Sequence, residues 1–78
     1  MFAYLFLGGG VVYANSATEF VERMRESSRN PADSIDDFID DVARRCYVYN
    51  ASVIRTDSHE HFVQDLKTND FVIAVHIN

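Results

Sequence analysis

The stretch that most constrains this chain is residues 1–14, which carry no charge and contain all three glycines of the protein. Apolar and aromatic residues fill both sides of the triplet Gly8-Gly9-Gly10, and every second side chain of a strand shares one face. Glycine adopts positive φ without steric cost, so a glycine turn between β-forming residues indicates a hairpin. The stretch therefore predicts a β-hairpin over residues 2–14, with the remaining elements packed against it.

The pattern of this stretch argues against three other interpretations. No Lys or Arg precedes the apolar run and glycines interrupt it, unlike a secretory signal peptide. The run is also shorter than the about 20 residues of a membrane-spanning helix. A phosphate-binding loop needs a GxxxxGK[ST] or GxGxxG frame, and neither is present. We therefore expect a plain turn, no membrane contact and a cytoplasmic location.

Two helices with recognisable start signals follow the hairpin. Ser16 and Glu19 have the spacing of a capping box and predict a helix over about residues 17–28. A second helix is predicted to begin at either Pro31 or Ser34, because both positions offer a first-turn signal. Its apolar stripe keeps helical spacing over three turns: Ile35, Phe38, Ile39, Val42, Ala43 and Cys46.

The end of the second helix is ambiguous in the sequence. Residues 47–49 fit either a last helical turn or a strand, because Tyr47-Val48-Tyr49 has β-forming composition. Asn50 is a candidate left-handed cap. Residues 51–55 are interpreted as a short extended segment, an edge strand through Val53 and Ile54.

The C-terminal part predicts a helix and a strand. A capping-box pattern at residues 57–60 predicts a short helix over about 58–67. Residues 71–77 are apolar on both faces, which is typical of an interior strand. The whole pattern predicts one α+β domain over residues 1–78 in ββααβαβ order. Its small sheet would contain the N-terminal hairpin and the C-terminal strand, with about three amphipathic helices on one face.

Helices on one face of the sheet would leave a second apolar face in water. Monomers rarely expose large apolar patches, and a chain of 78 residues buries only about 60% of its unfolded surface. Cys46 is the only cysteine, so no internal disulfide adds stability. We therefore predict a homo-oligomer with the sheet in the contact, and we assign the contact on the hairpin to Phe2, Tyr4 and Phe6.

The acidic balance of the chain disfavours direct binding of nucleic acid. The net charge is −5, and such binding depends on Lys and Arg. Four acidic residues that crowd the second helix are candidates for a docking surface: Asp36, Asp37, Asp40 and Asp41. One interpretation is a solvated helix face with acids placed favourably near the helix N-terminus. The other is a surface for a basic protein partner, which would make the chain an acidic inhibitor or a decoy that mimics nucleic acid.

Histidines are the only other candidates for chemistry. His59 and His61 are weak metal candidates, because two residues of separation do not place them on one helix face. His76 is expected to be a strand residue. No metal or cofactor is predicted. The favoured function is a non-catalytic interaction or regulatory module that acts as a homo-oligomer. The alternatives are the acidic decoy and a small enzyme or metal-binding protein with a histidine site at a subunit interface.

Overall fold

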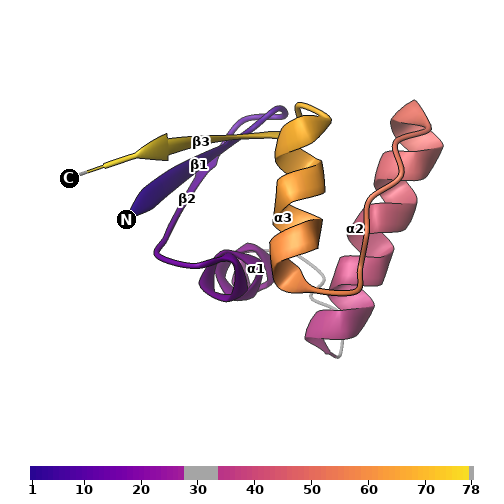
Figure 1. The fold of residues 1–78 in the computed structure, drawn as a ribbon, viewed down its shortest axis with the longest axis horizontal. Coiled ribbons are helices and arrows are strands. Elements are labelled where there is room, and N and C mark those ends of the chain that lie inside the picture. The colour runs from indigo at the N-terminus through magenta and orange to yellow at the C-terminus, as the bar shows by residue number, and fades with distance from the viewer. Residues whose placement is uncertain (28–33, 78) are drawn as a thin grey trace.

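The computed structural model describes residues 1–27 and 34–77 of the chain. A three-stranded sheet and three helices form a small α+β fold (Figure 1). The predicted fold class is confirmed, because the N-terminal hairpin and the C-terminal strand lie in one sheet. The elements in chain order are β1 (Phe2–Phe6), β2 (Val11–Ala14), α1 (Ala17–Glu26), α2 (Ile35–Asn50), α3 (His59–Thr68) and β3 (Val72–His76).

The sheet is antiparallel, and β1 is its central strand. The strand order is β2-β1-β3, and Leu5 lies between Val11 of β2 and Ile73 of β3. The glycine turn joins β1 to β2, with Gly9 and Gly10 at positive φ of 97° and 99°. The expectation of an interior position for the C-terminal strand is wrong, since among the described residues β3 pairs with β1 alone and forms an edge. Apolar residues on both faces of a strand do not decide whether it lies at the centre or the edge of a sheet, because that depends on strand order.

The segment at Val53 and Ile54 lies outside the described sheet. Ile54 is buried in the core, and the backbone N–H of Arg55 donates to the carboxylate of Asp65 in α3 at 2.9 Å. A side chain thus satisfies a backbone group that a neighbouring strand would otherwise satisfy. The expected edge strand is therefore replaced by a connection held to α3.

A serine caps the start of each helix. The hydroxyl oxygens of Ser16, Ser34 and Ser58 each accept a hydrogen bond at 3.1 Å from the backbone N–H three residues later. These bonds satisfy donors that a helix start leaves free. The structure therefore begins α2 after Ser34, and the alternative at Pro31 lies outside the described residues. The cap of α3 is Ser58, one residue after the first position of the predicted box.

The ambiguous segment after Cys46 is helical. Tyr47, Val48 and Tyr49 are the last exposed turn of α2, which ends at Asn50. The left-handed cap is Ala51, at φ 54°, rather than Asn50. Its backbone N–H donates to the carbonyl of Tyr47 at 2.7 Å, so the helical hydrogen-bond pattern extends through Asn50 before the chain turns.

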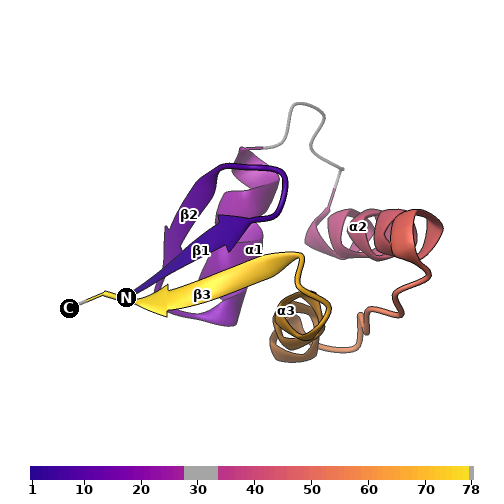
Figure 2. The ribbon, with the colours of Figure 1, turned by 90° about the horizontal axis from the view of Figure 1, so that it is seen from above.

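The core lies between the sheet and the helices. Helix α1 contacts β2 and α3 contacts β3, while α2 packs against α1 beyond the end of the sheet (Figures 1 and 2). Phe20 of α1 is fully buried, and its ring centroid lies 4.3 Å from that of Tyr4 and 5.8 Å from that of Phe6. Phe62 and Leu66 of α3 complete the centre of the core. The helices therefore cover one face of the sheet.

Candidate interaction surface

The face of the sheet opposite the helices is an exposed apolar surface. Alternation along each strand places every second side chain on this face, and the register brings them side by side. Their exposed fractions lie between 38% and 69%. We call this surface the outer face, and its seven large members are Leu5, Leu7, Val11, Tyr13, Ile73, Val75 and Ile77. No member carries a formal charge at neutral pH.

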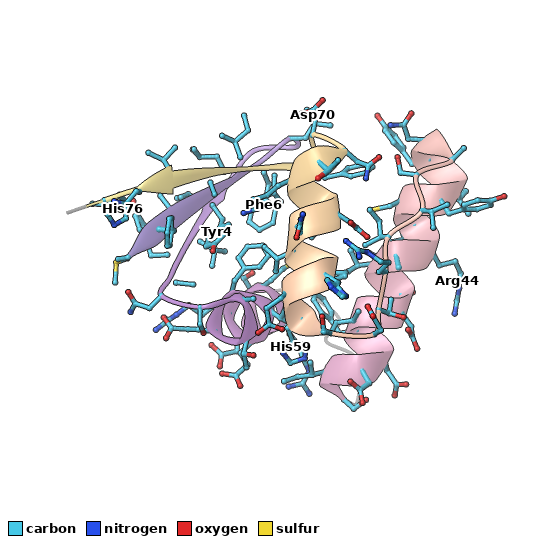
Figure 3. The ribbon with its side chains drawn as sticks, in the orientation of Figure 1. Tyr4, Phe6, Arg44, His59, Asp70 and His76 are labelled. Carbon is cyan, nitrogen blue, oxygen red and sulfur yellow. The ribbon has the colours of Figure 1, made fainter. Side chains whose placement is uncertain are left out.

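The predicted contact residues Phe2, Tyr4 and Phe6 lie on the other side of the sheet. Tyr4 is 6% exposed, and burial raises the pKa of its hydroxyl. Phe6 is half-buried against the core, and Figure 3 shows both side chains pointing toward the helices. Phe2 is exposed at the end of the strand, with its ring centroid 5.1 Å from that of His76. The large aromatic rings fill the layer between sheet and helices, so the aliphatic side chains of β1 face outward.

The outer face is large for a monomer. Its seven large side chains are each 38–69% exposed and extend across all three strands. Monomers rarely expose a contiguous apolar patch of more than a few hundred Å². The fully buried centre of a protein–protein interface is apolar in the same way. The outer face therefore resembles one side of such an interface.

The acidic residues of α2 do not belong to the outer face. Asp36, Asp37 and Asp40 are exposed along the first half of α2, which lies beyond the end of the sheet (Figure 2). Asp41 is half-buried, and its carboxylate pairs with Arg45 one helical turn later at 3.0 Å. This arrangement suits a solvated helix face. Docking of a basic partner on these residues stays a prediction.

The histidines are held apart in separate contacts. His59 Nδ1 lies 2.9 Å from the hydroxyl of Thr18 and links α3 to α1. His61 Nδ1 lies 3.0 Å from the carboxylate of Asp57. Figure 3 places His59 at the start of α3 and His76 away from it, at the far end of β3. Among residues 1–27 and 34–77, no three His, Cys, Asp or Glu side chains gather in a way that could hold a metal ion.

An ion pair that the sequence did not reveal connects the segment after α2 to α3. The Nε and terminal nitrogen of Arg55 donate to the two carboxylate oxygens of Asp65, each at 2.9 Å. These hydrogen bonds, with the one from the Arg55 backbone, lower the pKa of Asp65 to about 2. The two residues are ten positions apart, outside the spacing of helical pairs. No periodicity in the sequence therefore indicates this contact.

Asp65→Asn is expected to lower the Tm at pH 7 by about 5 °C, because it removes the charge that holds Arg55. The folded pKa of Asp65 lies below its usual value of 3.8, so the pair stabilises the fold fully above pH 5. This contribution is lost as the pH falls toward 2. Circular dichroism melts from pH 7 to pH 2 should show a Tm difference between wild type and variant that shrinks in acid. Asp40→Asn removes the same charge at an exposed site and serves as the control; equal melting of Asp65→Asn and wild type at pH 7 would contradict the prediction.

A second apolar feature is a groove beside α2. It has a volume of about 770 Å³ and is lined by α1, α2 and the residues around β1 and β3, including Met24, Val42, Tyr49 and Phe71. Cys46 also contributes to its wall, and burial raises the pKa of the thiol. The thiol therefore remains neutral at physiological pH. The groove offers apolar contact rather than a reactive thiolate.

Comparisons of the chain with protein-family models, with curated proteins and with solved structures each found no match. Within the described ranges, no helix is both long enough and apolar enough to cross a membrane. On the outer face, the described residues expose more neighbouring large apolar side chains than an ordinary monomer surface does.

Proposed function

We propose that this protein is a non-catalytic interaction module that acts as a homo-oligomer, with the outer face in the contact between copies. The observation that carries the proposal is the continuous apolar surface on the uncovered side of the sheet. Burial of apolar area is the main favourable term in protein association. Covering this face would remove most of the large apolar surface that the sheet exposes to water.

A second copy of the chain suits this face better than a charged partner does. The chain carries a net charge of −5, so most surfaces of two copies repel each other. The large side chains of the outer face are uncharged, and a twofold axis would bring the same apolar patch of two copies together. Such a contact would bury the apolar side chains of all three strands in each copy, as the centre of a stable interface does.

Leu5→Lys tests the proposal, because Leu5 lies on the central strand in the middle of the outer face. An unpaired ammonium group buried in the contact is expected to weaken association by about 100-fold or more. Size-exclusion chromatography with light scattering at micromolar concentration should show more than one copy for wild type and fewer for the variant. Circular dichroism should show the same helix and strand content in both.

Val48→Lys is the matched control. Val48 is 79% exposed on α2, away from the sheet, and the substitution changes the charge by the same amount. Its copy number should equal that of wild type. A wild-type protein that elutes as a single copy, or a Leu5→Lys variant with unchanged copy number, would overturn the proposal.

A further inference from the structure

The edge of β3 presents backbone groups that the described sheet leaves unpaired. The backbone N–H of Ile77 donates to Met1, and that of Leu7 donates to Phe71, each at 2.9 Å. In an antiparallel ladder such bonded positions recur at every second residue. With the observed register, the groups of Ile73 and Val75 therefore point to β1, and those of Val72, Ala74 and His76 point away from it.

The available part of this edge is its C-terminal half. Val72 is only 2% exposed, where the chain leaves α3 and enters the sheet. His76 is exposed and Ala74 is half-buried. The unpaired N–H and C=O groups that another strand can reach are therefore those of Ala74 and His76.

The β3 edge lacks the devices that normally prevent strand pairing. Natural edge strands carry charged residues, prolines or bulges. Residues 71–77 contain no Lys, Arg, Asp, Glu or Pro, and the ladder between β1 and β3 is regular. The edge of β2 is different, because Arg23 and Glu26 of α1 line a hollow together with Val11 and Tyr13. The charges beside β2 leave β3 as the unprotected edge.

We infer that the β3 edge pairs antiparallel with the β3 edge of a second copy, joining two three-stranded sheets into one of six strands. The inference rests on the proposed function, because the outer faces of two such sheets then pack together in an assembly of four copies. Two kinds of isologous contact, one at the edge and one at the face, close into a four-copy assembly with dihedral symmetry when their twofold axes cross at right angles.

A pairing centred on Val75 fits the available groups. Ala74 then exchanges both backbone hydrogen bonds with His76 of the second copy, and His76 does the same with Ala74 of that copy. On the outer face, Val75 lies opposite its own counterpart, and Ile73 lies opposite Ile77. Cross-strand pairs of β-branched residues stabilise a sheet, and no like charges meet in this register. The strand is therefore complementary to itself.

His76→Pro tests the edge contact. The substitution removes an N–H that points away from β1, and proline is tolerated in an edge strand at such a position. In the assembly it deletes a hydrogen bond in each copy and places a ring against the neighbouring strand. His76→Ala loses the same imidazole but keeps the N–H, so it is the matched control. Light scattering is expected to give four copies for wild type and His76→Ala, and two for His76→Pro.

Leu5→Lys separates this inference from the proposed function. It should give two copies joined at the edge, and the double variant Leu5→Lys with His76→Pro should give one. If His76→Pro has the copy number of wild type while Leu5→Lys has fewer, the edge contact is overturned and the face contact stands. If only His76→Pro reduces the copy number, the face contact is overturned and the edge contact stands. A wild-type protein that is a single copy overturns both the edge contact and the face contact. The same holds if its β3 edge binds only a peptide from another protein.

Amide hydrogen exchange of the wild-type protein tests the same contact without a substitution. Pairing at the edge should slow exchange at Ala74 and His76 to the range of Ile73 and Val75, whose N–H groups bond to β1. Fast exchange at Ala74 and His76, beside slow exchange at their neighbours, would overturn the inference even if His76→Pro failed to fold.

Discussion

Phe20→Ala is expected to lower the free energy of unfolding by about 3–5 kcal/mol, the usual cost of removing a buried phenylalanine ring. A domain of this length has a total stability of roughly 4–12 kcal/mol, so the substitution should remove a quarter of it or more. Phe20 is fully buried and lies between α1 and the rings of Tyr4 and Phe6. Its loss leaves a cavity at the junction that attaches the first helix to the sheet.

Urea denaturation followed by circular dichroism, at one protein concentration throughout, measures this loss. Tyr49→Ala removes an aromatic side chain that is 80% exposed, and its cost should stay within about 0.5 kcal/mol. Phe20→Leu keeps most of the side-chain volume, so its loss in free energy of unfolding should lie between those of Phe20→Ala and Tyr49→Ala. An unfolding midpoint of Phe20→Ala near that of wild type would show that the contact of Phe20 with the rings of Tyr4 and Phe6 does not stabilise the fold.

Val75→Pro is expected to prevent folding, although it changes a residue on the surface of an edge strand. The N–H of Val75 points toward β1, where the register pairs it with Ala3 of the central strand. Proline removes this donor and places its ring in the space of the neighbouring strand. Because β3 closes one side of the sheet and Val72 belongs to the core, losing this strand also opens the hydrophobic core.

The adjacent variant His76→Pro supplies the control for Val75→Pro. Both introduce one proline into the same half of β3, but the lost N–H of Val75 points toward β1 and that of His76 points away from it. His76→Pro should retain the far-ultraviolet spectrum and cooperative melting of wild type, whereas Val75→Pro should lose both. Equal behaviour of the two variants would show that the observed register of β3 on β1 is incorrect.

Local signals in the sequence located most elements of this fold. Each helix begins after a serine whose hydroxyl bonds three residues ahead, a contact that depends only on nearby residues. The hairpin was readable because three glycines separate two β-forming runs. Such signals do not depend on tertiary contacts, so they can be recognised in the sequence alone.

The choice between the two faces of the sheet could not be predicted in the same way. Alternation separates Tyr4 from Leu5, but both are apolar, and only the position of α1 decides which is covered. The sequence predicts Phe2, Tyr4 and Phe6 at the contact between copies. Tyr4 lies in the core and Phe6 packs against it, whereas Phe2 is exposed at the end of β1. The pair between Arg55 and Asp65 was missed for a related reason, because it depends on how a connection folds back on α3.

The position of β1 between β2 and β3 has a consequence during synthesis on the ribosome. Leu5 must pair with Ile73, which is translated 68 positions later. Until then one edge of the central strand is unpaired and the hydrophobic core is incomplete, so the apolar N-terminal hairpin stays exposed to water. Contacts this distant in sequence slow folding, and exposed strands of this kind are prone to aggregate. We expect the nascent chain to depend on chaperones until residues 71–77 have left the exit tunnel.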